Sequence, residues 1–100
     1  MGLSGKQRRH LRALGHKLRA IVQVGREGLS GEVARACAAA LADHELIKVK
    51  IGPGAPDGRQ SVASALAEAT DAEVAQVLGK TILLYRPRPA DDPRPRIRLP

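Results

Sequence analysis

Apolar residues recur along the chain at two spacings, one typical of helices and one typical of strands. Between Ser4 and Leu18 the leucines fall on one side of a helical wheel. Between Leu46 and Ile51 the pattern alternates, which places Ile47, Val49 and Ile51 on one face and Leu46, Lys48 and Lys50 on an exposed face of a half-buried strand. The same criteria predict strands at 20–24, 73–78 and 81–86 and helices at 30–44 and 59–70.

The predicted order is helix, strand, helix, strand, helix, strand, strand. Helices between strands favour an α/β fold, with one compact domain, a small four-stranded mixed sheet and helices packed on it. One hundred residues suit a single domain with a modest core. Beyond Pro87 the chain is dominated by proline and arginine, so we expect residues 1–86 to form the domain and residues 87–100 to form an extended or disordered tail. This tail is either an auxiliary electrostatic arm or a solvated end.

A glycine-bracketed turn, Gly25-Arg26-Glu27-Gly28, lies between the strand at 20–24 and a helix for which Ser30 is a suitable N-cap. A G-x-x-G taken alone is usually a plain turn. Here the two glycines remove Cβ obstruction, Arg26 offers a bidentate phosphate donor, and the following helix contributes N–H groups and a positive dipole end. Glu27 opposes this electrostatically.

Basic residues are concentrated at the two ends of the chain. Residues 1–26 contain seven Lys and Arg and no acid, residues 27–85 contain five against eight Asp and Glu, and residues 86–100 contain five against two, which gives +7 in all. Such a field attracts nucleic acid or an anionic membrane. The basic side of the first helix, where Arg8, Arg12 and Arg19 form one stripe, also carries Lys6, Arg9, His16 and Lys17.

Catalytic and metal-binding signatures are lacking in the sequence. Cys37 lies in an alanine run where a buried thiol is usually inert, and it lacks the companions of a zinc site. No phosphate-loop, dinucleotide or acidic-pair motif is present, so we expect no enzyme, no cofactor, no metal and no small-molecule substrate. A lone cysteine and the lack of a long apolar run fit a reducing cytoplasm and no membrane.

Aromatic residues are nearly absent, and this narrows the possible modes of recognition. Tyr85 is the one aromatic side chain, so base stacking on rings cannot dominate. Sugar and phosphate contacts by Arg, Lys and backbone amides remain. Arg86, which alternates with Tyr85, is either a ligand-binding residue or a solvated surface arginine.

Four segments occur in the same order in a known family. They are LRALGHKLRAI from Leu11, VGREGLS from Val24, HELIKVKI from His44 and GKTILLYRP from Gly79. The chain resembles the CRM domain in its stand-alone bacterial form, the YhbY-type ribosome-assembly proteins. The resemblance implies a fold similar to the C-terminal domain of translation initiation factor three, with a KH-like GxxG loop on a basic RNA-binding surface and association with precursors of the large ribosomal subunit. The positions that match its RNA-binding residues are Gly25, Arg26, Gly28, Lys48 and Lys50.

The sequence therefore predicts a non-catalytic, monomeric RNA-binding protein that associates with pre-ribosomal large-subunit RNA. Its expected surface combines the first helix, the glycine turn and the second strand, with both the helix and the turn facing one way, and comprises Lys6, Arg8, Arg9, Arg12, His16, Lys17, Gly25, Arg26, Gly28, Lys48, Lys50 and Arg86. Three alternatives stay open: an adaptor that docks its basic face on an acidic protein, a general nucleic-acid binder that includes duplex DNA, and a cryptic RNA-modifying enzyme.

Overall fold

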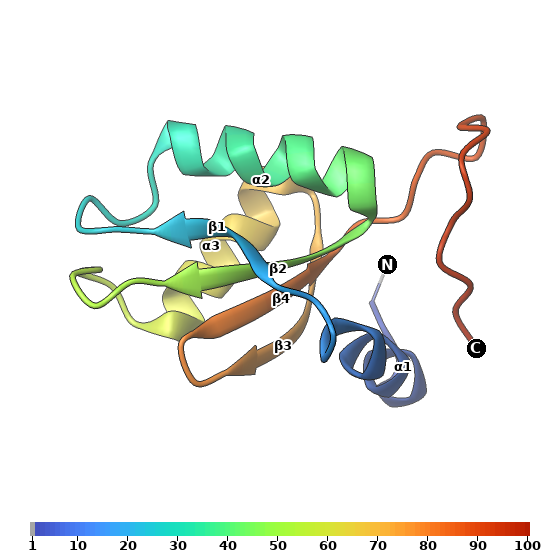
Figure 1. Ribbon diagram of the computed structural model, residues 1–100, viewed down its shortest axis with the longest axis horizontal. Helices are drawn as coiled ribbons and strands as arrows, with labels where there is room; N and C mark the ends of the chain where they lie inside the picture. Colours follow the sequence, from blue (N-terminus) through green and yellow to red (C-terminus); the bar gives the residue numbers. More distant parts are fainter. Residues whose placement is uncertain (1) are drawn as a thin grey trace.

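The computed structural model describes residues 2–100, and Met1, the first residue of the expected domain, lies outside them. Three helices and four strands follow one another in the expected order (Figure 1). Their bounds are α1 Gly5–Gly15, β1 Ala20–Val24, α2 Gly31–His44, β2 Leu46–Ile51, α3 Arg59–Thr70, β3 Glu73–Leu78 and β4 Thr81–Tyr85.

Helix α1 is shorter than the leucine spacing predicts. It begins with a capping box, in which the Ser4 hydroxyl accepts from the Gln7 backbone N–H and the Gln7 side chain accepts from the Ser4 N–H. It ends at Gly15, whose carbonyl accepts from the Leu18 N–H at 3.0 Å as the chain turns toward β1. Arg19 therefore lies beyond the helix, and the predicted stripe of Arg8, Arg12 and Arg19 is wrong in its last member.

The sheet is mixed, as predicted, with the order β1-β2-β4-β3. Strands β1 and β2 run parallel and are joined by α2, whereas β2–β4 and β3–β4 are antiparallel. In the parallel pair Ala20 lies opposite Lys48 and Gln23 opposite Lys50, and a bulge interrupts the register between Ala20 and Val22. Strand β1 is thus an edge strand that runs beside the two lysines of β2.

Both faces of the sheet are covered, by different elements (Figure 1). Helices α2 and α3 pack on one face through a cluster that includes Cys37, Leu41, Leu66 and the inward residues of β2. On the other face α1 contributes Leu11 to a second cluster that also holds Leu46, Leu83 and Tyr85. Leu46 is therefore buried, which corrects the expectation of an exposed face: α1 covers the start of β2 and leaves Lys48 half-exposed and Lys50 exposed.

The C-terminal segment beyond β4 has no helix or strand but folds back on the domain (Figure 1). The backbone N–H groups of Arg88 and Ile97 both donate to the carboxylate of Glu45, at 2.6 Å each. Ile97 and Leu99 pack against the second cluster, under the same face as α1. The sequence predicted an extended or disordered tail that serves as an electrostatic arm or a solvated end. The segment is extended, but hydrogen bonds and apolar contacts hold it on the fold.

Candidate nucleic-acid interface

The glycine turn is a tight turn between β1 and α2. The Gly28 N–H donates to the Gly25 carbonyl at 3.0 Å, and Gly28 has φ +70°, a left-handed conformation that glycine adopts without strain. Helix α2 begins at Gly31, where the Ser30 hydroxyl accepts from the Val33 N–H at 3.2 Å. Arg26 and Glu27 are both exposed at the tip, so the turn presents one cation and one anion to solvent.

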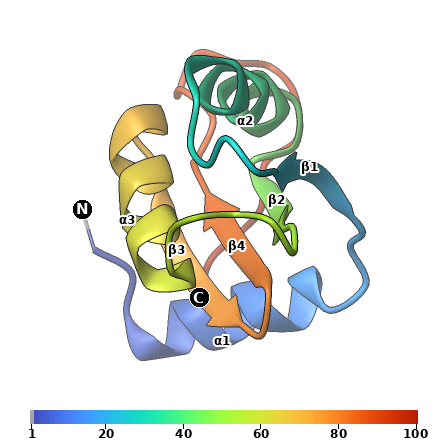
Figure 2. The same ribbon diagram turned by 90° about the vertical axis from the view of Figure 1, so that its left-hand side faces the viewer.

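The turn packs against the loop at 52–58, which joins β2 to α3 (Figure 2). The Gly52 N–H donates to the Val24 carbonyl at 2.8 Å. A Cβ on Gly54 would lie 2.5 Å from Arg26 Cγ, so the stem of Arg26 rests on the Gly54 backbone. The second loop therefore supports Arg26. Sequence reasoning missed this contact, which follows from the parallel pairing of β1 with β2, because the C-terminal ends of parallel neighbouring strands meet at one edge of a sheet.

Four cations follow the edge of the sheet, and we call them the β1 track: Arg19, Lys48, Lys50 and Arg26. Arg19 directly precedes β1 and Arg26 follows it, while Lys48 and Lys50 lie opposite its first and fourth residues. The four steps of β1 span about 13 Å at about 3.3 Å per residue. None of the four cations forms a salt bridge within residues 2–100, so their charge is available to a ligand.

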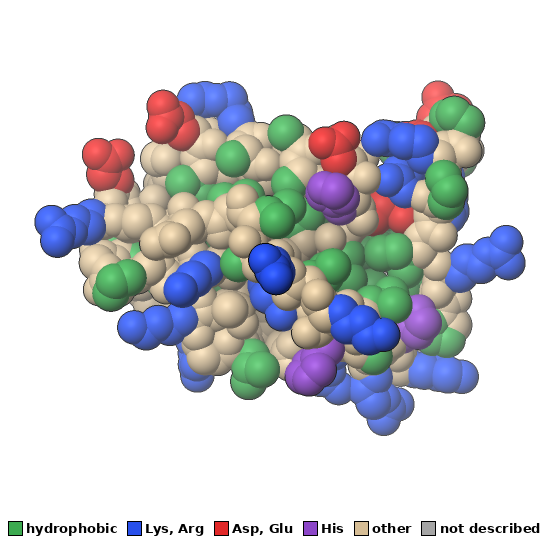
Figure 3. Space-filling view, viewed as in Figure 1, with side chains coloured by type: hydrophobic (Ala, Val, Ile, Leu, Met, Phe, Trp, Pro, Cys, Tyr) green, Lys and Arg blue, Asp and Glu red, His purple; other side chains and the backbone are tan. Residues whose placement is uncertain are grey.

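The face that carries β1 shows the same arrangement at the surface. In Figure 3, Lys and Arg side chains extend from the β1–α2 turn on the left, across the edge of the sheet, to α1 at the lower right. The acidic side chains visible there lie along α2, at the loop before it and in the C-terminal segment. A series of basic side chains therefore leads from the turn to α1, with no acidic side chain visible between them.

Only the C-terminal end of α1 adjoins this path. His16 and Lys17 are exposed between the helix and β1. Lys6, Arg8 and Arg9 lie in the first half of the helix, which Figure 2 shows running away from β1 beneath the sheet. Arg8 is half-buried and donates to the Leu3 carbonyl at 2.6 Å. The expected helix surface is thus divided, with Arg12 in its last turn nearer to β1.

Arg86 lies elsewhere and is held inside the fold. It is half-buried, and its guanidinium donates to the Thr70 carbonyl at 2.9 Å and the Ala38 carbonyl at 3.0 Å. Two further arginines act on α2 in the same way, since Arg88 donates to the Asp43 carbonyl and Arg94 to the Ala42 carbonyl. Cations at a helix C-terminus satisfy its free carbonyls and its dipole. Arg86 is therefore better explained as a structural residue, and we leave it out of the proposed surface.

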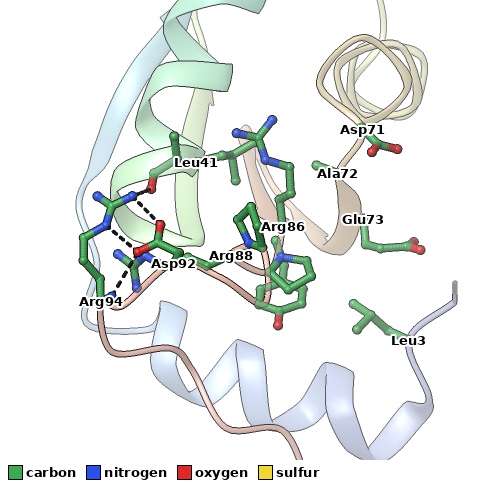
Figure 4. Close-up of a pocket in the computed structure, with 13 residues that line it drawn as sticks. Leu3, Leu41, Asp71, Ala72, Glu73, Arg86, Arg88, Asp92 and Arg94 are labelled. Carbon is green, nitrogen blue, oxygen red and sulfur yellow. Dashed lines mark hydrogen bonds and ion pairs between the residues drawn. The ribbon is translucent and has the colours of Figure 1, made fainter.

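A hollow of about 650 Å³ lies beside these arginines (Figure 4). Its charged lining balances, with three acids against three arginines: Asp71, Glu73 and Asp92, and Arg86, Arg88 and Arg94. The guanidinium of Arg94 donates to the Asp92 carboxylate at 2.8 Å, and this contact lowers the pKa of Asp92 to about 2. Because its charges are mutually compensated, the hollow offers little attraction for a polyanion.

Residues capable of chemistry are not assembled in the described part of the chain. Cys37 is fully buried among α2, α3 and the sheet, and burial raises the pKa of its thiol to about 11. The thiol is thus protonated and shielded from solvent at neutral pH. Within residues 2–100 no group of three or more His, Cys, Asp or Glu side chains is placed to hold a metal ion. The same residues contain no helix of sufficient length and apolarity to span a bilayer.

The fold and surface together define a small α/β domain with a cationic sheet edge and a glycine turn at its end. The chain belongs to the CRS1/YhbY (CRM) domain family, whose model matches residues 3–86. This confirms the resemblance found in the sequence. The family is one of non-catalytic RNA-binding domains, so the expectation that the protein is not an enzyme is confirmed as well.

Relatives of similar length share this domain. The chain is 38% identical to "Probable RNA-binding protein YqeI" of Bacillus subtilis over 84 residues, which are 84% of this chain and 88% of the relative. It is also 38% identical to a protein of Haemophilus influenzae named "RNA-binding protein", over 85% of this chain and 86% of the relative. The solution structure of a Staphylococcus aureus protein, described as a candidate RNA binder, matches with a TM-score of 0.79 at 36% identity and covers 98% of this chain and 99% of that one. The compact α/β fold is thus that of a solved relative.

Proposed function

We propose that the protein binds RNA along the β1 track, with the glycine turn at one end and the last turn of α1 at the other. The observation that carries the proposal is the alignment of four exposed or half-exposed cations with a single sheet edge. The names of the relatives, which refer to RNA binding, support it. Phosphate contacts by Arg and Lys give affinity with little dependence on sequence, which suits a surface without exposed aromatic rings.

The test is a double variant, Arg26→Gln with Lys48→Gln, measured by filter binding to single-stranded RNA over a range of salt. If both side chains contact phosphates, affinity falls and the slope of log affinity against log salt loses about 1.4, at about 0.7 per contact. The matched control is Lys6→Gln with Arg9→Gln, which removes the same charge from the far half of α1. Unchanged affinity of the first variant at low salt would remove Arg26 and Lys48 from the mechanism.

The same pair of variants separates specific binding from general attraction. A surface that binds any polyanion through net charge alone predicts equal losses for the two double variants. Binding along the β1 track predicts a larger loss for the Arg26 and Lys48 variant. Competition between RNA and duplex DNA of equal length then distinguishes the two polymers, and binding that survives nuclease treatment of an extract would favour an adaptor that docks on an acidic protein.

We propose further that the RNA is ribosomal and belongs to precursors of the large subunit, which would place the protein in the cytoplasm. The support for this finer assignment is the resemblance to YhbY-type proteins described above. Crosslinking in living cells followed by sequencing of the bound RNA tests it. Large-subunit ribosomal RNA should dominate the recovered reads, and its absence would contradict the ribosomal assignment while leaving RNA binding intact.

A further inference from the structure

An apolar groove opens at the α1 end of the β1 track. Four large hydrophobic side chains are exposed within residues 2–100, and three of them, Leu14, Leu18 and Ile21, line this one groove of about 390 Å³. The fourth, Leu78, is 60% exposed at the end of β3 and does not line it. Exposed apolar residues that gather in one concavity are characteristic of binding sites, and the volume lies in the range of ligand pockets.

Two local features of the chain create the groove. Helix α1 ends at Gly15, so Leu18 no longer faces the sheet as the helical pattern predicts. The bulge between Ala20 and Val22 leaves Ile21 without a partner on β2, and its side chain is 53% exposed. The first residues of β2, from Leu46 to Lys48, and Ile97 of the C-terminal segment also line the groove. The fold thus holds apolar side chains at the surface between elements that are otherwise well packed.

The charges around the groove have a single sign. The cations Arg19 and Lys48 line it, and no acidic residue does. Arg19 and Lys48 are also the first two cations of the β1 track. An occupant of this groove is therefore expected to combine an apolar flat or compact part with adjacent negative charge.

We propose that the groove holds one unstacked base of the bound RNA, with the flanking phosphates on Arg19 and Lys48. This rests on the RNA binding proposed above and adds a base contact to it. Bases that leave the stack are held between aromatic or apolar side chains, so aliphatic walls can also make this contact. Tyr85 is 3% exposed, so its ring is not available to stack on a base, whereas the aliphatic side chains of the groove are exposed and can cover one.

The test compares RNA with and without bases. The probes are a single-stranded oligouridine and an oligonucleotide of the same length and backbone whose internal nucleotides are abasic. The wild-type protein should bind the base-containing strand more tightly, by about fivefold, at the low end for one stacked base. A double variant, Leu18→Ala with Ile21→Ala, should lose this preference and keep the salt slope, because no phosphate contact is removed. Leu78→Ala, which removes a still more exposed leucine outside the groove, should keep both.

Each result has a defined meaning. Equal binding of both strands by the wild type, or a preference that persists in the double variant, would overturn the base site while RNA binding stands. Failure of the wild type to bind either strand would overturn RNA binding itself. Loss of an acidic protein partner in the double variant, without change in RNA binding, would show that the groove takes a protein side chain and would also overturn the base site. If the double variant melts early, Ile21→Ala alone carries the comparison, since that side chain is already more than half exposed.

Discussion

Glu45 is the anchor of the C-terminal segment, and its removal gives the sharpest test of how that segment is held. The residue is 1% exposed, at the junction of α2 and β2. Its Oε2 accepts from the Arg88 N–H and its Oε1 from the Ile97 N–H, both at 2.6 Å, and the Arg88 guanidinium lies 3.5 Å from Oε1. Replacement of Glu45 by alanine removes both acceptors together.

Two limits determine the expected loss of stability. Hydrogen bonds to a charged group contribute about 1.5–3 kcal/mol each, so loss of both N–H partners would cost about 3–6 kcal/mol if the segment stayed in place. The segment can instead detach and hydrate its N–H groups, and the cost is then limited to what docking contributes. That contribution includes the partial burial of Ile97 and Leu99, about 2–3 kcal/mol together. We therefore expect Glu45→Ala to lower the free energy of unfolding by about 2–4 kcal/mol, or Tm by roughly 10–20 °C.

Backbone strain does not alter this comparison. Glu45 has φ +61°, a conformation that is costly for any residue with a Cβ, and alanine keeps that Cβ. The strain is therefore the same in both proteins and cancels from the difference. The measured change reports the carboxylate.

The assay is urea unfolding followed by circular dichroism, on four chains: wild type, Glu45→Ala, a truncation after Pro87, and the combination. If Glu45 acts by holding the segment, the two single changes cost similar amounts and the combination costs no more than either. Glu68→Ala, at an exposed position on α3, is the control for loss of a carboxylate. Additive losses, or a Glu45→Ala variant within 0.5 kcal/mol (about the usual effect of a neutral surface change) of wild type, would refute the reasoning.

Two further predictions concern the core. A Cβ on Gly15 would lie 2.8 Å from both Cδ atoms of the buried Leu83, so Gly15→Ala should lower the free energy of unfolding by about 1–3 kcal/mol through overpacking. The control is Gly5→Ala in the same helix, which has open space around it and should leave stability unchanged or slightly raised. Thermal melts measure both. Burial raises the pKa of the Cys37 thiol to about 11, so the folded state favours the protonated thiol more than the unfolded state does. The stability that this preference contributes is complete below about pH 9, near the pKa of an unfolded thiol, and is lost as the pH rises toward 11. Chemical unfolding at pH 8 to 11 should show this decline in the wild type and a weaker one in Cys37→Ala, and identical declines would contradict it.

The elements were predictable because their signals are local. Strict alternation identified β2, and Ser30 before an apolar helical pattern identified the start of α2. The predictions were wrong where the elements packed around a segment, rather than its own sequence pattern, determine which of its residues are buried. The alternation correctly put Leu46, Lys48 and Lys50 on one face, but could not show that α1 covers only the first of them.

The sequence predicted which residues belong to the candidate site better than how those residues are arranged in space. The turn, Arg26 and the two lysines of β2 were identified from residue types and resemblance. Their alignment along β1 depends on the parallel pairing of β1 with β2, which no short-range pattern specifies. Whether they bind RNA stays a prediction. The support of Arg26 by the loop at 52–58 depends on the same pairing, because both loops leave the same end of the sheet.

The basic residues of the chain separate into two groups by what surrounds them, and this changes the meaning of the net charge. Arg88 and Arg94 donate to carbonyls in the last turn of α2, and Arg86 donates to the Thr70 carbonyl at the end of α3 and to the Ala38 carbonyl within α2. The helix dipole is negative at both of these helix ends. The charge of these arginines is largely compensated within the fold, so the excess of +3 counted for residues 86–100 overstates what a polyanion meets there. The cations of the β1 track form no salt bridge with a carboxylate within residues 2–100. Neutral substitutions in the C-terminal segment should therefore act first on stability, and those in the β1 track first on the affinity for RNA.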